Sequence, residues 1–372
     1  MPETIVDLRG GLAIGARQLL DRAAGADARA RSTLVAAIDD VFLPAEARLD
    51  DRTRAALASL LTALAATVAG EVREHGGRLL TNRGERGLAA LLMHDESPVI
   101  ERLAGAGLLR DPEFLGECLA RIELELLAAA IPVQAPDHPD TASLIVRLVR
   151  SPDRVVAIAA AAVLAGESHR RAAQEGGALA GTGLPAELHH RLVWWVAAAI
   201  RERHVAAAGE RLPALNRALS EAAMRNLSAH DEGDRLEGAT MRLAAAIGAQ
   251  PDELPPLLTG AIRDRRITLF TALLATALGI GFEIARGVVL DPAGDRLWLA
   301  LRALDIPRET IAEVGYLLSE ADPRRDVEVF ADLLDAITAV APDAARGAIA
   351  PLRLPAGFRA AIVALDAARV QR

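Results

Sequence analysis

The chain has 372 residues, of which 52% are hydrophobic but only 3% aromatic, so its core must be built mainly from alanine, leucine, valine and isoleucine. Its single cysteine, Cys118, excludes an intramolecular disulfide and favours a reducing, cytoplasmic environment. The net charge of −8 argues against nucleic acid or an anionic membrane as a partner, because binding to either usually needs a basic excess. We also expect no secretory signal, since the first residues lack a basic region followed by an apolar one.

Helix starts recur along the chain as an aspartate or serine followed directly by proline. These pairs begin at Ser97, Asp111, Ser151, Asp291 and Asp322. A side-chain oxygen at the cap can accept from the free amides of the first turn, and proline there has no amide to leave unpaired. Apolar residues at helical spacing follow each pair, and almost no segment alternates with period two. The sequence therefore predicts an all-α protein.

Longer units also repeat. Residues 91–107 are similar to 148–166, and the Asp-Pro pair at 291 is echoed at 322, 31 positions later. Each unit continues with an apolar helix, and such a period of some 30 to 45 residues is typical of helical solenoids. We predict a HEAT-like helical-repeat array, arranged as one α-solenoid or as two packed helical subarrays.

Two helices are apolar on nearly every side. The first follows Ser151, and in a stacked array it would be covered by its own partner and by both neighbours. We therefore expect one set of its side chains to face protein: Val155, Val156, Ile158, Ala159, Ala162 and Val163. The second, residues 267–282, is shorter than the roughly 18 to 20 residues that a membrane span requires. We predict a buried helix there and no membrane span.

Breaks rich in proline and glycine divide the chain at residues 132–140, 174–185 and 208–213. They suggest three parts. An N-terminal helical subdomain covers 1–135, central HEAT-like helices cover 136–210, and a C-terminal helical-repeat subdomain covers 211–372.

Three stretches, residues 114–132, 188–204 and 267–321, resemble an alphaproteobacterial family designated only as a domain of unknown function. The similarity extends over about residues 90–340. The resemblance implies an α-helical, HEAT-like protein of a bacterial cytoplasm. It brings no catalytic residues with it.

Residues 188–204 hold two of the three tryptophans and form the best candidate contact surface. On a helix, His190, Trp194 and Arg201 fall towards one side, with Arg203 nearby. They could form an aromatic and basic patch for a ligand or partner, or line a groove wall or an internal contact. The adjacent His189 should point about 100° away from His190 on a helix.

Other candidate sites are weaker. No histidine pair has the spacing of a zinc motif, and the glycine-rich stretches 176–183 and 279–287 lack the context of a phosphate loop. Cys118 has acidic neighbours, which would raise the pKa of its thiol, and a buried inert thiol is the favoured interpretation. We predict no catalytic residue, no metal and no cofactor.

The leading hypothesis is a non-enzymatic, cytoplasmic scaffold or adaptor that binds a protein partner in a groove of the helical array. We predict its contact residues as His190, Trp194, Arg201 and Arg203. Self-association as a homo-oligomer is compatible with this hypothesis. Two other classes stay open: a small-molecule sensor or enzyme with an apolar pocket between domains, and a nucleic-acid binder with a continuous arginine stripe.

Overall fold

A computed structural model describes residues 49–133, 142–174, 179, 181–355, 357–359, 361–362 and 365. The chain divides into two units, residues 1–54 and 55–372. Of the first unit, the described residues include only 49–54, which open the first described helix; there Asp50 Oδ1 accepts from the Thr53 amide at 2.8 Å. The rest of this account concerns the second unit.

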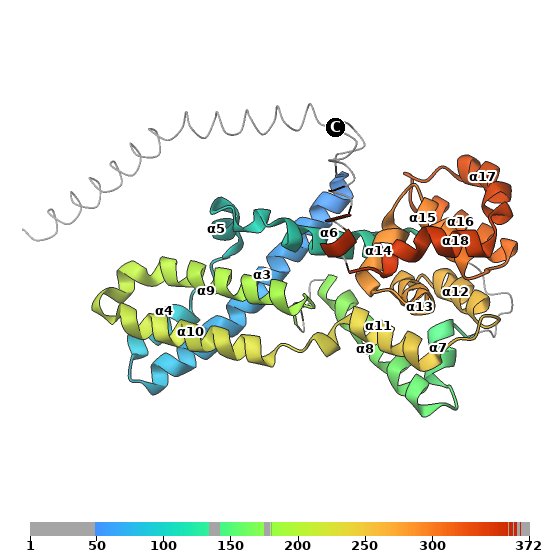
Figure 1. The fold of residues 1–372 in the computed structure, drawn as a ribbon. Coiled ribbons are helices and arrows are strands. Elements are labelled where there is room, and N and C mark those ends of the chain that lie inside the picture. Colours follow the sequence, from blue (N-terminus) through green and yellow to red (C-terminus); the bar gives the residue numbers. More distant parts are fainter. Residues whose placement is uncertain are drawn as a thin grey trace, which may run out of the picture. The chain divides into compact units, whose positions relative to one another are not determined.

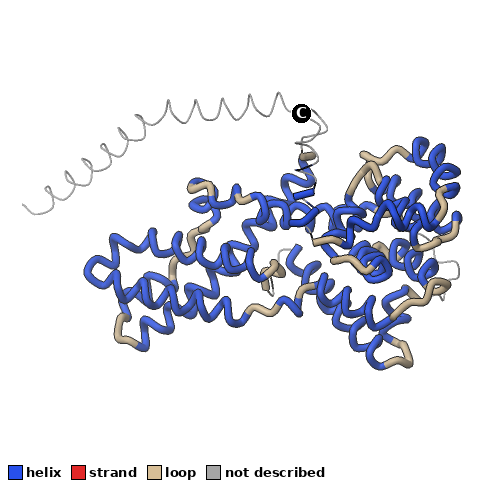
Figure 2. The backbone as a smooth tube through the Cα atoms, viewed as in Figure 1, coloured by secondary structure: helices blue, strands red, loops and turns tan. Residues whose placement is uncertain are grey.

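The described residues are helical and contain no strand, which confirms the all-α prediction (Figures 1 and 2). The α-helices are α3 (Asp51–Asn82), α4 (Arg86–Met93), α5 (Ile100–Gly105), α6 (Pro112–Ala130), α7 (Leu144–Val149), α8 (Arg154–Gln174), α9 (Ala186–Ala208), α10 (Leu212–Ala229), α11 (Leu236–Ile247), α12 (Leu254–Arg263), α13 (Ile267–Leu278), α14 (Phe282–Leu290), α15 (Asp295–Ala303), α16 (Arg308–Ala321), α17 (Val327–Ala339) and α18 (Pro342–Ile349). Short 3₁₀ turns lie between or after them: η2 (Leu108–Arg110), η3 (Gly209–Arg211), η4 (Glu232–Asp234) and η5 (Ala350–Arg353).

The predicted cap lies where expected at one of the five proline-led starts. Asp111 caps α6, and its Oδ1 accepts from the Phe114 amide at 2.9 Å. At the other four starts the helix begins two to four residues after the proline, so the proline lies before the first helical turn. Before α8 and α17 a later aspartate acts as the cap: Asp153 accepts from the Val155 amide and Asp326 from the Glu328 amide, each at 2.8 Å. The fixed φ of proline fits a short turn before the cap as well as it fits the first position of the helix.

Two hydrophobic cores organise the second unit. The first joins α3, α4, the start of α6, α9 and α10, with Leu64, Phe114 and Ile200 fully buried. The second joins the end of α6, α7, α8 and α11 to α18, around Phe270 and Leu301. Because α6 contributes Phe114 to one core and residues after Ile122 to the other, this helix connects them.

The cores are interleaved along the chain. α7 and α8 pack in the second core, α9 and α10 return to the first, and α11 begins the long final contribution to the second. Thus α8 and α9, which both lie in the predicted central segment 136–210, belong to different cores. The predicted break at 208–213 is the tight turn between α9 and α10, which lie side by side in Figure 1. Most of the predicted linker at 132–140 and part of that at 174–185 lie outside the described residues.

The expectation that α8 faces protein on every side is wrong. Val156 and Val163 are buried, but Val155 is 66% exposed and Ile158 63% exposed, and Ala162 is exposed as well. α8 packs mainly on α7 and α11, which cover one side of it. The physical reason is that a helix needs neighbours around its whole circumference to be buried, and α8 has them on one face.

The apolar stretch 267–282 forms α13, a turn at Gly279 and the start of α14, bent by 118°. Nine of the twelve residues of α13 are buried, so the prediction of a buried helix is confirmed. Within the described part of the chain, α3 is the one unbroken helix that is long and apolar enough to cross a membrane, by length and composition alone. Its inner face, with Leu64, Val68 and Val72, packs in the first core.

Candidate functional site

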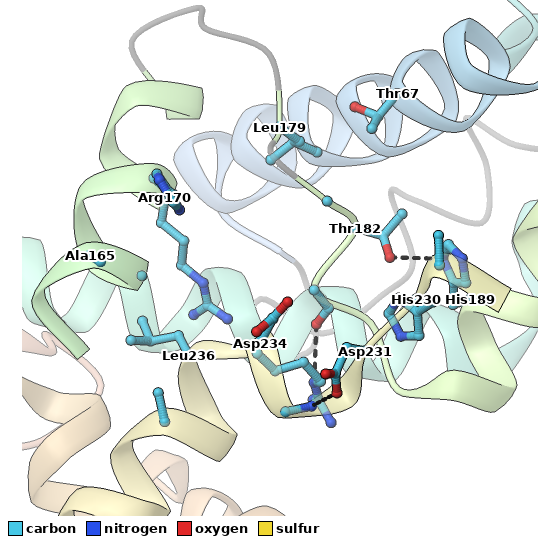
Figure 3. A pocket seen from close by; sticks show the side chains of 18 of the residues that line it. Thr67, Ala165, Arg170, Leu179, Thr182, His189, His230, Asp231, Asp234 and Leu236 are labelled. Carbon is cyan, nitrogen blue, oxygen red and sulfur yellow. Dashed lines mark hydrogen bonds between the residues drawn. The ribbon is translucent and has the colours of Figure 1, made fainter. Parts of the chain in front are cut away.

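A cavity of about 660 Å³ lies where the two cores meet (Figure 3). Its walls come from α3, α8, the start of α9, the end of α10 and the segment from η4 into α11. Thr182 and Gly183, in the loop that leads to α9, form another wall. Helices from both cores therefore line one cavity with a mixed polar and apolar surface. Its lining residues lie up to 175 positions apart in the sequence, from Thr67 to Arg242.

One wall of the cavity belongs to a buried network of arginines and glutamates. On α6, Glu117, Arg121 and Glu125 are spaced four residues apart and share a face. Arg121 Nε lies 3.2 Å from Glu125 Oε1, and its Nη1 donates to the Thr182 carbonyl at 3.1 Å. Arg235 Nη2, just before α11, lies 3.1 Å from Glu117 Oε1. The loop before α9 and the start of α11 are thereby fixed to α6.

The network continues into α8, α11 and α14. Arg170 Nη2 of α8 lies 2.5 Å from Glu237 Oε1 of α11, and Arg286 Nη2 of α14 lies 2.6 Å from Glu117 Oε2. Arg286 also pairs with Glu283. Four arginines and four glutamates from α6, α8, α14 and the start of α11 therefore neutralise one another beside the cavity.

The protonation state of this network follows from its pairing. Burial alone would raise the pKa of Glu237, but Arg170 and Arg235 outweigh burial and hold that pKa at about 2. Glu237 is therefore a carboxylate at neutral pH. Removing one member of a buried ion pair leaves the charge of the other without compensation. The stability of the network therefore depends strongly on every pair being complete.

The opposite wall holds two stacked histidines. The rings of His189 on α9 and His230 after α10 lie 4.0 Å apart and nearly parallel, at 15°. His189 Nδ1 is 2.9 Å from Thr182 Oγ1, and His230 Nε2 donates to the Leu184 carbonyl at 3.0 Å. Burial lowers the pKa of His189 to about 4, with His230 adding to the effect. His189 is therefore neutral at physiological pH.

Two of the predicted contact residues of α9, His190 and Trp194, face away from the side of that helix that carries His189. His190 is exposed, Trp194 half-buried, and Trp194 Nε1 donates to His190 Nε2 at 3.1 Å. The predicted divergence of His189 from His190 is confirmed, since His189 is buried. The structure brings His190 and Trp194 together; their role in binding a partner stays a prediction.

The two predicted arginines turn to different neighbours. Arg201 Nε donates to Asn216 Oδ1 of α10 at 2.7 Å, whereas Arg203 Nε lies 3.4 Å from Asp95 Oδ1, after α4. The four residues therefore do not converge on one point. Cys118 is fully buried, as predicted, and burial raises the pKa of its thiol to about 12; its lack of reactivity stays a prediction. Over the described ranges, no three histidine, cysteine or acidic side chains gather as a metal site would require.

A second exposed surface was not anticipated from the sequence. It consists of Val155 and Ile158 on the outer face of α8, and of Arg147, Arg150 and Arg154 around the α7–α8 turn; we call it the α8 surface. All five side chains are exposed. Within the described part of the chain, none of the three arginines lies within ion-pair distance of an acidic side chain.

Sequence reasoning also missed the cavity and its network. The spacing of Glu117, Arg121 and Glu125 was an available signal, because charges at every fourth position share one helix face. Their partners Arg170, Arg235 and Arg286 could not be found in this way, since each lies on an element that only the tertiary fold brings near α6.

Neither a characterised protein nor a solved structure shows significant similarity to the chain. Residues 138–350, more than half of the chain, match the family described as "Uncharacterised protein conserved in bacteria (DUF2336)". The match runs from just before α7 to η5 and includes α8, the cavity wall from η4 to α11, and most of the second core. It confirms the resemblance inferred from residues 114–321: the chain belongs to this bacterial family of unknown function.

Proposed function

We propose that this protein is a non-enzymatic, cytoplasmic adaptor that binds an acidic amphipathic helix of a partner protein on the α8 surface. The observation that carries the proposal is the exposure of Val155 and Ile158, at 66% and 63%, on a well-formed helix. Clustered aliphatic side chains of this kind on a rigid element are typical of docking sites.

The α8 surface is held in place from behind. Val156 and Val163, on the other side of the same helix, are buried in the second core, and the Asp153 cap fixes the first turn. Val155 and Ile158 are three residues apart, so they lie on one face, and Ala162 continues that face. A partner helix can therefore bury both side chains without any rearrangement of α8, and fully burying each contributes about 1.5–3 kcal/mol.

The charges around the apolar centre favour an acidic partner. Arg147, Arg150 and Arg154 are exposed and lie within eight residues of Val155 along the chain, with one exposed acid, Asp153, among them. Rim charges of one sign speed the encounter with a partner of the opposite sign and set its orientation. The apolar centre and the overall net charge of −8 favour protein over nucleic acid, which is recognised chiefly by a broad basic surface.

The predicted surface on α9 remains a second contact region in this proposal. Its side chains are already engaged within the chain, Trp194 with His190, Arg201 with Asn216 and Arg203 with Asp95. A partner would have to compete with those contacts, whereas Val155 and Ile158 are free of such competition. We therefore place the main contact on α8.

The proposal includes a HEAT-like architecture for the helices that carry the surface. Helices adjacent in sequence pack as pairs, as α7 does on α8 and α12 on α13, and α8 and α13 both pack on α11. This arrangement supports a repeat array in which α8 is an outer member. Self-association through the same face is the competing outcome of the test.

The test places a photo-crosslinking amino acid at position 158 in the full-length protein, in bacterial cells. We expect one crosslinked partner, attached within a helix that bears several acidic residues. With that partner purified, Ile158→Ser should weaken binding about tenfold or more, and Arg150→Glu/Arg154→Glu should weaken it most at low salt.

The matched control is Val329→Ser, which changes an exposed valine on α17 and should leave the affinity unchanged. The proposal fails if the partner binds Ile158→Ser as tightly as the parent. It also fails if the crosslinked segment is a second copy of this chain or a basic segment.

A further inference from the structure

One face of α17 carries apolar side chains that the rest of the described chain leaves largely uncovered. α17 packs on α15 and α16, and its Phe330 and Leu334 are buried in the second core. On another face Val329 is 54% exposed and Leu333 42% exposed, and the exposed Ala336 follows them, at intervals of four and three residues. Residues at this spacing share one face of a helix, and we call this face the α17 stripe.

The charge around the α17 stripe is negative. α17 contains three acidic residues, Glu328, Asp332 and Asp335, and no basic residue. Asp335 Oδ1 lies 2.6 Å from Arg308 Nη2 of α16. Glu328 and Asp332 are exposed, and among the described residues no basic side chain lies within ion-pair distance of either. The α17 stripe therefore favours a partner that has basic residues beside its apolar side chains.

A second apolar stripe lies later in the same chain. The described residues between 357 and 365 are helical, and among them Phe358 is 57% exposed, Ile362 36% and Leu365 69%. These three also follow one another at intervals of four and three residues, so they share one helix face, which we call the 358–365 stripe. Clustered apolar side chains on an exposed face are typical of interaction sites, whereas single ones occur anywhere on a surface.

The charge around the 358–365 stripe is positive. From residue 351 to residue 372 the sequence has four arginines and one aspartate. Arg353 Nε donates to the Leu278 carbonyl at 3.0 Å, and Arg359 Nη1 donates to the Leu352 carbonyl at 2.8 Å. Neither arginine has an acidic side chain within ion-pair distance in the part of the chain that the structure describes, so both keep an uncompensated charge.

We propose that the protein self-associates through these two surfaces, with the α17 stripe of each copy binding the 358–365 stripe of the other. The stripes have the same spacing and opposite surrounding charge, and every copy carries both. When each copy supplies both halves of the contact, the two contacts close a dimer with twofold symmetry. The dimer removes Leu333 of one copy and Phe358 and Leu365 of the other from water, which favours association.

This contact is separate from the α8 surface. Neither stripe includes Val155 or Ile158, so self-association and the binding of an acidic helix are tested by different variants. Failure of one proposal therefore leaves the other standing.

The test measures the mass of the full-length protein by sedimentation equilibrium over a range of concentrations. At high concentration the mass should approach twice the 39.2 kDa of one chain. We expect a Kd of about 10 μM, because two short helical contacts lie at the small, weak end of specific interfaces.

Two exposed positions provide charge-reversal variants. Leu333→Arg introduces a positive charge opposite the basic 358–365 stripe, and Leu365→Asp introduces a negative charge opposite the acidic α17 stripe. Each variant alone should self-associate about a hundredfold more weakly, because like charges meet in both contacts. An equimolar mixture of the two variants should dimerise again, since one of its contacts is unaltered and the introduced charges in the other are opposite in sign.

Restoration of the dimer in the mixture also shows that both variants are folded. Ile158→Ser on α8 is the control and should dimerise like the parent protein. The inference is overturned if the parent is monomeric at the highest concentration, if Leu365→Asp dimerises like the parent, or if the mixture stays monomeric. A monomeric Ile158→Ser would overturn it as well, because the contact would then lie on α8.

Discussion

α8 and α13 differ in a way that their sequences do not reveal. α13 is rich in leucine and alanine, α8 is rich in alanine and valine over its first three turns, and both of these stretches are almost free of polar side chains. Yet nine of the twelve residues of α13 are buried, whereas on α8 Val155 is 66% exposed and Ile158 is 63% exposed. Apolar composition alone therefore does not determine burial, and an apolar helix that remains exposed becomes a candidate for binding.

The cause of the difference is the number of neighbours. α13 packs on α6, α11, α12 and α14, which surround it, whereas α8 packs chiefly on α7 and α11. α13 thus contributes to stability through its whole circumference, and α8 through one face. The outer face of α8 remains available for a partner.

The largest expected effect tests this contrast directly. Phe270→Ala in α13 removes a fully buried ring and should lower the free energy of unfolding by about 3–5 kcal/mol. Ile158→Ala in α8 should change it by less than about 0.5 kcal/mol, as at other exposed positions. Denaturant unfolding of both variants measures the difference. Equal losses would show that α8 is covered in solution.

The second prediction concerns the buried His189 and its exposed neighbour His190. The pKa of His189 is lowered to about 4 in the folded protein. Between pH 6.5 and 4 the His189 ring is therefore protonated in the unfolded chain but neutral in the folded chain. Stability should therefore fall as the pH drops through this window, by about 3 kcal/mol in all at 1.36 kcal/mol per pKa unit. Unfolding curves at several pH values measure the slope. His189→Gln should flatten it and His190→Gln should not; an unchanged slope in His189→Gln would contradict the assignment.

Glycines on enclosed and open helix faces give a third, smaller contrast. A Cβ at Gly315 of α16 would lie 1.9 Å from the Phe330 ring of α17, so Gly315→Ala should cost about 1–3 kcal/mol. Gly287 of α14 has open space around it, and Gly287→Ala should stabilise the protein by about 0.5–1 kcal/mol. Melting temperatures report both effects. A stabilising Gly315→Ala would mean that α16 and α17 pack less closely than described.

The smallest expected effect is an absence of reaction. Cys118 is fully enclosed in the first core, and burial raises the pKa of its thiol to about 12. Iodoacetamide should leave the folded protein unmodified at pH 8 and modify it completely in denaturant, as mass spectrometry would show. Rapid alkylation of the native protein would indicate that the first core opens readily, unlike the region around α13.

Much of the local structure could be predicted from the sequence, because it depends on neighbours along the chain. The helices, their proline-led starts within a few residues, the buried stretch of α13 and the divergence of His189 from His190 all follow from spacing and backbone preference. The exact caps were less predictable: Asp153, not Ser151, caps α8, since either position satisfies the same local rules. The candidate site was less predictable still, because α6, α8, α11 and α14 each supply one part of its charge network.

By itself, then, the sequence determined an all-α chain with a core poor in aromatic residues, one thiol and two unusually apolar helices, since these depend on composition and local periodicity. Only the tertiary structure decided that α9 and α10 return to the first core while α8 and α11 build the second. That interleaving encloses α13, exposes Val155 and Ile158, and brings His189 beside Asn226. The physical reason is that burial and ion pairing depend on which distant segments meet, and each segment's own pattern is compatible with more than one partner.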